Sequence, residues 1–202
     1  MRRSEYLWHR LHKHALATEF SAVWVDRLEL DELAQRAGAD FRQARRCGRD
    51  ELAAEVFAVR DATVIWADRL TGDWLQIIEF GGYGCSGAVR ELSAHGGRAV
   101  SAGWGLNGVR DLGHVSDGYD TTLFSVTVPG ERYGNAPDAL DPLAKGLIFD
   151  LGDTSWTADP ELAPGWSAHA ERSAWMEEND HLVGDEEWLS GSHPRLVIPH
   201  RL

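Results

Sequence analysis

Lysine, cysteine and long apolar runs are all scarce in this sequence of 202 residues. Lys13 and Lys145 are the only lysines among 20 basic residues, and Cys47 and Cys85 are the only cysteines. Two distant cysteines outside any CxxC pattern do not make a disulfide framework, which favours a reducing compartment. No apolar run approaches the roughly 20 residues of a membrane-spanning helix, and the basic start lacks the apolar stretch of a signal peptide. We therefore expect a cytoplasmic protein, and the preference for Arg over Lys suggests a bacterial one.

Positive charge is also in short supply, because 20 basic residues face 32 acidic ones and the formal net charge is −12. Residues 1–60 are nearly neutral, whereas residues 61–150 and 151–202 carry net charges of −6 and −7. Phosphate contacts need clustered Lys and Arg, so this balance argues against a nucleic-acid or membrane partner. The five arginines between Arg36 and Arg49 are interpreted as a solvated helix face rather than a DNA-binding patch. The acidic remainder favours a basic protein partner.

The hydrophobic pattern predicts an α+β fold in a single domain over residues 1–202. We expect a mostly antiparallel sheet of about five to six strands, with helices from both chain ends packed on it. Thr71-Gly72 and Asp117-Gly118 are typical hairpin turns, and residues 73–80 predict a central strand because apolar groups occur on both faces. The β-rich runs are 20–25, 61–70, 73–80, 98–104, 112–116 and 121–128, with a possible edge strand over 195–200.

The remaining segments have helical or loop patterns. Asp31 is predicted to cap a helix that continues to Ala37 and ends at Gly38. The Pro-, Gly- and Asp-rich residues 152–165 predict a long mobile loop, and residues 179–202 form an acidic tail region. Further helices are predicted over 4–17, 88–94, 137–144 and 166–178.

The sharpest motif is Gly82-x-Gly84-x-x-Gly87, which follows a strand and precedes a helix as in dinucleotide-binding folds. The helix after it is too short for a crossover, and Asn107 stands about where a ribose-binding acid belongs. A Gly-rich turn is the favoured interpretation. Cys85 at the helix start predicts a stabilised thiolate, but no complete catalytic set accompanies it and we assign no catalytic residue.

Nine tryptophans are many for this length, and seven of them fall into two groups. Three of them lie in strand-like runs and are expected in the core: Trp24, Trp66 and Trp74. Four others lie among Gly, Asp, Ser and Pro: Trp104, Trp156, Trp166 and Trp188. Exposed tryptophans beside acidic residues are typical of interfaces that bind through aromatic anchors.

Short motifs over residues 61–143 resemble an uncharacterised actinobacterial family that is classed as a domain of unknown function. The resemblance continues more faintly over residues 20–37, and it departs from the family pattern at Gly81 and after Asp150. It implies no known activity. The motifs are Gly72-Asp73-Trp74, Ile78-Glu79, Gly82-Tyr83, Ser86, Leu92-Ser93, Asn107, Asp117-Gly118, Phe124, Arg132-Tyr133-Gly134, Pro137-Asp138 and Leu140.

Two hypotheses follow. The first is a non-enzymatic, immunity- or adaptor-like interaction module that binds a basic protein through an acidic, Trp-containing surface. The alternative is a small-molecule or nucleotide-binding enzyme centred on the Gly82–Gly87 turn, where Glu79 acts as a base or orienter. No cofactor and no metal site is predicted. The candidate binding residues are Glu79, Gly82, Tyr83, Gly84, Ser86, Trp104, Asn107, Asp117, Trp156 and Trp166.

Overall fold

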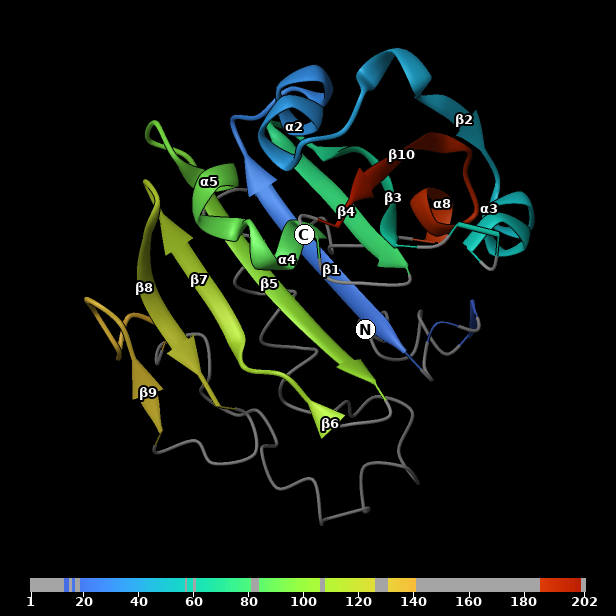
Figure 1. Ribbon diagram of the computed structural model, residues 1–202. Helices are drawn as coiled ribbons and strands as arrows, with labels where there is room; N and C mark the ends of the chain where they lie inside the picture. Colours follow the sequence, from blue (N-terminus) through green and yellow to red (C-terminus); the bar gives the residue numbers. More distant parts are fainter. Residues whose placement is uncertain are drawn as a thin grey trace.

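The computed structural model describes residues 13–14, 16, 19–56, 58–59, 61–80, 84–105, 108–125, 131–140 and 186–200. Its strands form one antiparallel sheet of ten strands, in the order β2-β10-β3-β4-β1-β5-β7-β8-β9, with β6 paired to β5 (Figure 1). The strands are β1 (Phe20–Asp26), β2 (Arg45–Cys47), β3 (Ala62–Thr71), β4 (Trp74–Phe80), β5 (Arg98–Gly105), β6 (Gly108–Val109), β7 (Leu112–Ser116), β8 (Tyr119–Phe124), β9 (Arg132–Tyr133) and β10 (His193–Pro199).

This sheet confirms the mostly antiparallel α+β prediction, but the predicted number of five to six strands was too small. The strands missing from the prediction are β2, β6 and β9, which have three, two and two residues. A strand this short is too brief to show a periodic pattern of its own. Its pairing depends on a neighbour elsewhere in the chain.

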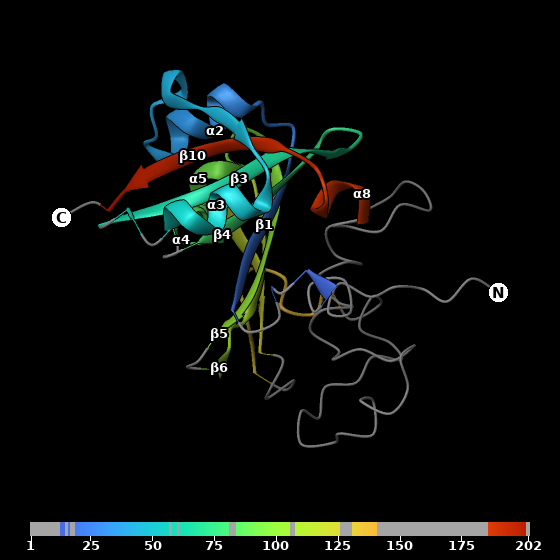
Figure 2. The same cartoon turned by 90° about the vertical axis from the view of Figure 1, so that its right-hand side faces the viewer.

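Short helices cover both faces of the sheet. In Figure 1, α2, α4 and α5 lie in front of it, and Figure 2 shows α5 and α8 on opposite sides. The helices are α2 (Leu30–Ala37), the 3-10 turn η1 (Phe41–Gln43), α3 (Arg49–Val56), α4 (Gly84–Gly87), α5 (Val89–Ser93) and α8 (Glu186–Leu189).

The predicted helix that ends before Gly38 is confirmed as α2, but its cap was wrong. The N-cap position is Glu29, and Asp31 lies inside the first turn, where its carboxylate complements the helix dipole. The helix predicted over 88–94 is α5. Residues 137–140 form a turn, and the rest of the helix predicted there lies outside the described residues.

Two hydrophobic layers form because successive strand side chains point to opposite faces. Along β1, Val23 and Val25 pack under α2 and α5, whereas Ala22 and Trp24 belong to the opposite layer. Trp24 and Trp66 are fully buried, as predicted. Trp74 is partly buried, with the Arg98 guanidinium 5.7 Å from its ring.

Both predicted hairpins are present. Thr71 pairs with Trp74, so the β3–β4 turn consists of Gly72 and Asp73, one residue later than predicted. Asp117 and Gly118 join β7 to β8 with positive φ angles of 50° and 80°, as a type I′ turn requires. β4 is a central strand, as predicted, because it lies between β3 and β1.

The C-terminal strand was predicted at an edge, and this was wrong. β10 pairs with β2 on one side and with β3 on the other, so it is an internal strand. The edge position belongs to β2, whose residues Arg45–Cys47 carry no apolar alternation that a sequence reading could detect.

Several predictions fall where the structure is not described. They are most of the helix over 4–17, the loop over 152–165 and the helix over 166–178. Of the tail region, residues 186–200 are described and form α8 and β10. Within the described part of the chain, no helix combines the length and apolar character needed to cross a membrane.

Candidate functional site

A hollow of about 440 Å³ opens on the β5–β7–β8 side of the sheet, next to α4 and α5. On the same face α2, α4 and α5 cover the neighbouring part of the sheet (Figure 1). Polar and apolar residues line the hollow in nearly equal parts, and the polar ones include a guanidinium, two carboxylates and two hydroxyls. The lining residues are Ser86, Val89, Ser101, Ala102, Gly103, Arg110, Asp111, Gly113, Val115, Asp120 and Leu123.

Two glycines, Gly103 and Gly113, form the floor of the hollow, where a side chain would come too close to neighbouring atoms. A Cβ on Gly103 would lie 2.8 Å from the Phe20 carbonyl oxygen and 3.3 Å from Nη2 of Arg110. A Cβ on Gly113 would lie 2.5 Å from Oγ of Ser101. Glycine within a strand typically marks a close approach of another group, and here it leaves room for the Arg110 guanidinium above β5.

Arg110 and Ser86 meet at the wall of this hollow. The Arg110 backbone N–H donates to the Gly103 carbonyl oxygen at 2.9 Å, which fixes the residue beside β5. From there its Nη1 donates to Oγ of Ser86 at 3.3 Å. A guanidinium and a hydroxyl side by side can bind a carboxylate or another oxyanion.

Glu79 holds the Gly-rich turn in place from beneath. This carboxylate is buried at the end of β4, where it accepts hydrogen bonds from Oγ of Ser21 at 2.6 Å and from the backbone N–H groups of Cys85 at 2.5 Å and Ser86 at 3.1 Å. A pyrophosphate bound at this turn would need the same two N–H groups. In this structure the chain's own carboxylate already accepts both of these hydrogen bonds.

The Cys85 side chain does not carry the predicted thiolate. It is fully buried, and burial together with the negative charge of Glu79 raises the pKa of the thiol well above its ordinary value. The sequence argument relied on the helix start, but its N–H groups point to Glu79. Among the described residues of this turn, Ser86, one residue later, is the one that lines the hollow.

Asp117 does not join Glu79. It lies in the β7–β8 turn, where Oδ1 accepts a hydrogen bond from the Gly96 N–H at 2.7 Å. Ser21, which contacts Glu79, pairs with Gly103, whereas the turn follows the pair of Arg98 with Ser116. Five residues along β5 separate these levels by about 17 Å.

Trp104 is not an exposed anchor. Its exposed fraction is 7%, and its ring lies 4.5 Å from that of Phe20 on the neighbouring strand. Trp188 is buried as well, at 6%. Gly84 opens α4, and its Cα faces Ile198 of β10. Five other predicted site residues lie outside the described part of the chain: Gly82, Tyr83, Asn107, Trp156 and Trp166.

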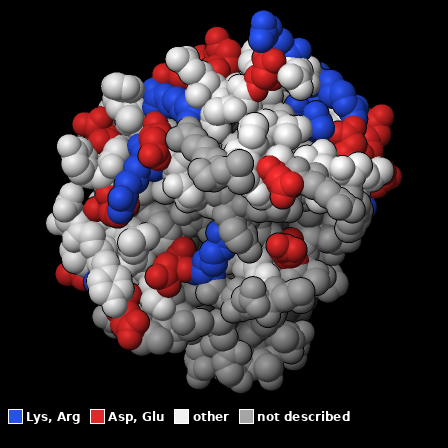
Figure 3. Space-filling view, viewed as in Figure 1, with Lys and Arg blue, Asp and Glu red and all other residues white. Residues whose placement is uncertain are grey.

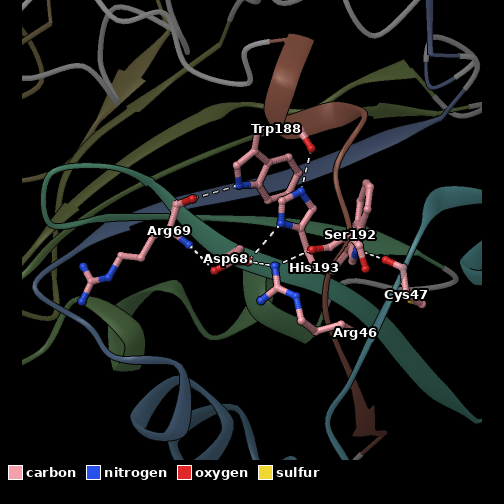
Figure 4. A network of polar contacts seen from close by, with 8 residues as sticks. Arg46, Cys47, Asp68, Arg69, Trp188, Ser192 and His193 are labelled. Carbon is pink, nitrogen blue, oxygen red and sulfur yellow. Dashed lines mark hydrogen bonds and ion pairs between the residues drawn. The ribbon is translucent and has the colours of Figure 1, made fainter.

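A second polar network joins β10 to β2 and β3 at the other end of the sheet (Figure 4). Nδ1 of His193 lies 3.1 Å from Oδ2 of Asp68, and Nε2 lies 2.6 Å from the Trp188 carbonyl oxygen. The Trp188 ring stacks on the imidazole at 4.0 Å, and Nη2 of Arg46 lies 2.8 Å from Asp68. His193 is buried, and each of its ring nitrogens lies within hydrogen-bond distance of a partner. This His–Asp pair therefore links β10 to β3, and neither nitrogen is left to act as a general base.

The electrostatics of Asp68 fit this structural role. Burial alone would raise the pKa of its carboxyl, but hydrogen bonds from His193, the Arg69 backbone N–H and Arg46 lower it below its ordinary value. The carboxylate is therefore held charged by its three partners. A buried network whose groups bond to one another in this way stabilises a fold.

The described part of the face in Figure 3 carries acidic and basic side chains side by side, without a single acidic patch. Several acids of the described residues pair with arginines, among them Asp120 with Arg90 and Asp40 with Arg42. The expected acidic binding surface is not evident on this part of the molecule.

Sequence reasoning missed most of the hollow. Arg110, Ser101 and Asp111 belong to no motif, and they come together only because β5 and β7 are paired. One signal was present in the sequence. Gly103 and Gly113 interrupt β-rich runs, which is a sign of close approach by another group.

The fold and the hollow define an α+β protein with a large antiparallel sheet and a concave polar site beside a Gly-rich turn. The chain belongs to a family of unknown function, DUF6461, whose model matches residues 2–177. The family match agrees with the resemblance found over residues 61–143 and extends it in both directions. No curated protein and no solved structure matched the chain.

Proposed function

We propose that the protein binds a small polar molecule in the hollow beside α4, without covalent chemistry. The observation that carries this proposal is the convergence of Arg110 and Ser86 on a space of about 440 Å³. The glycine floor supports it, because a side chain on Gly103 would displace the guanidinium. This is the small-molecule half of the alternative drawn from the Gly82–Gly87 turn.

The nucleotide half of that alternative is not part of the proposal. Glu79 already accepts hydrogen bonds from the backbone N–H groups of Cys85 and Ser86. The two acids that line the hollow, Asp111 and Asp120, would repel a polyphosphate. A small ligand needs only the Arg110 and Ser86 side chains and the floor between β5 and β7.

The test is a thermal-shift panel of amino acids, hydroxy acids, phosphate monoesters and monosaccharides. A ligand at about 100 times its Kd adds about 2.7 kcal/mol, or about 5–10 °C in Tm for a chain of this size. We expect Arg110→Gln to abolish the gain and Arg42→Gln, a change of the same charge at an exposed site, to keep it. The proposal fails if no compound raises Tm, or if Arg110→Gln responds like the wild type.

Our second proposal is the non-enzymatic interaction module with a basic protein partner. What favours it is charge, since residues 61–202 hold 22 acidic and 9 basic side chains. Of the four tryptophans expected in polar loops, Trp156 and Trp166 remain as its aromatic anchors, because Trp104 and Trp188 are buried. A pulldown from the native host should recover a basic partner whose binding weakens as salt rises. Binding that does not depend on salt contradicts this proposal.

A further inference from the structure

The hollow carries charges of both signs within two consecutive residues. Arg110 lies beside β5, and Asp111 follows it at the start of β7. Asp111 is exposed, and among the described residues it forms no ion pair. The other lining acid, Asp120, is engaged by Arg90, whose Nε donates to its Oδ1 at 2.9 Å. Of the two acids that line the hollow, Asp111 is therefore the one that can pair with a cationic group of a ligand.

The hollow also has aliphatic lining residues. Val115 is fully buried on β7, and Leu123 pairs with Gly113 across the β7–β8 ladder. Val89, the first residue of α5, adds a third aliphatic side chain. Three branched aliphatic groups suit an aliphatic ligand group of similar size.

We propose that the ligand is an α-amino acid with an aliphatic side chain, a conclusion that rests on the proposed function of the hollow. Arg110 and Ser86 would bind its carboxylate, and Asp111 its ammonium group. The side chain would lie against Val89, Val115 and Leu123. In an α-amino acid the two charged groups are attached to one carbon, which matches a donor and an acceptor on consecutive residues.

Other ligand classes fit these groups less well. A phosphate monoester carries two negative charges and would meet Asp111 as well as Arg110. A monosaccharide has no charged group to pair with Arg110 or Asp111, and it would place hydroxyl groups against the aliphatic side chains. A simple carboxylic acid would use Arg110 and leave Asp111 without a partner.

Isothermal titration of the full chain with three probes tests this assignment: L-leucine, N-acetyl-L-leucine and L-leucinamide. The acetyl group removes the ammonium charge, and the amide removes the carboxylate. We expect L-leucine to bind at least tenfold more tightly than either, since each charge-assisted contact contributes about a factor of ten or more. In Asp111→Asn the preference for L-leucine over N-acetyl-L-leucine should disappear, while the matched control Asp50→Asn, at a 96% exposed side chain, keeps it.

The possible outcomes separate this inference from the proposed function. Equal binding of L-leucine and N-acetyl-L-leucine overturns the amino-acid assignment, and the hollow stands as a carboxylate site. If all three probes fail but another compound of the thermal-shift panel binds through Arg110, the ligand class is wrong and the proposed function stands. If the whole panel fails as well, both are wrong.

Discussion

The two ends of the sheet use their polar groups in opposite ways. At the β2–β10–β3 end, Asp68 and His193 contact each other, and the His193 ring packs against the rings of Trp66 and Trp188. At the β5–β7–β8 end, Gly103 and Gly113 carry no side chain, and beside them lies a hollow lined by both polar and apolar residues. The first arrangement stabilises the fold, and the second leaves room for a ligand. A polar cluster therefore indicates a binding site only where the packing around it is incomplete.

Removing the histidine at the closed end should have the largest effect on stability. His193→Ala leaves a cavity beside the rings of Trp66 and Trp188 and removes a partner from the half-buried Asp68. We expect a loss of about 3 kcal/mol in the free energy of unfolding, measured by urea denaturation. His193→Gln, which can still donate one hydrogen bond, should lose less. A loss below about 1 kcal/mol for His193→Ala would contradict the structural role given to this end.

Glu79 links the fold to the open end, and its removal should have the next largest effect. Glu79→Ala leaves the Ser21 hydroxyl and two backbone N–H groups without their acceptor. The expected loss is about 2 kcal/mol, whereas Glu79→Gln retains one acceptor oxygen and should lose about half as much. If both variants unfold at the wild-type urea concentration, the turn is held by other contacts.

A small change in the floor of the hollow should affect binding more than stability. The Cβ of Gly113→Ala meets Oγ of Ser101, which can turn aside, so we expect a loss of about 1 kcal/mol or less. The ligand gain in Tm should fall together with the volume of the hollow. Gly48→Ala is the control, because its Cβ would meet no atom within 4 Å. A Gly113→Ala variant that binds like the wild type would place the ligand elsewhere.

The smallest effect concerns a second buried histidine, on β7. Neither ring nitrogen of His114 has a hydrogen-bond partner in the described structure, in contrast to His193. Burial, and then the positive charge of Arg98, lower the pKa of His114 below its ordinary value of 6.5, and Asp26 opposes this shift. Because the folded pKa lies below the unfolded one, stability is complete above pH 6.5 and falls as the pH drops through the folded pKa.

His114→Leu should remove this acid-dependent loss. Replacing an unpartnered buried polar group with an apolar one is neutral or stabilising, so we expect a gain of up to about 1 kcal/mol at pH 7.5. Urea denaturation at pH 7.5 and pH 5 measures both effects. A wild-type stability that rises between pH 7.5 and pH 5 relative to the variant would show that His114 is stabilised in its charged form.

Local chemistry explains which parts of the fold could be predicted from the sequence. Asp117-Gly118 predicts its hairpin because both residues tolerate positive φ. The pairing of β10 with β2 could not be predicted, since Arg46 and Ser192 are 146 residues apart and β2 has no apolar pattern. Trp104 was misplaced for a related reason, because its burial depends on Phe20 across the β1–β5 ladder.

The candidate site was predicted in part. The sequence singled out Glu79, just before a Gly-rich turn, and Ser86 within this turn, and the structure links them by a hydrogen bond. It could not identify Arg110, whose position depends on the backbone contact with Gly103. Spacing along the chain placed Asp117 in the same set, but the sheet carries it to the far end of β7.

The most direct test of the account is to locate bound ligand by amide chemical shifts in a titration with L-leucine. We predict shifts for Ser86, Ser101, Gly103 and Gly113, and none for the β10 amides around His193. The same titration of Arg110→Gln should leave the spectrum unchanged. Shifts confined to the β2–β10–β3 end, or the same shifts in wild type and Arg110→Gln, would contradict the claim that the open end of the sheet is the binding site.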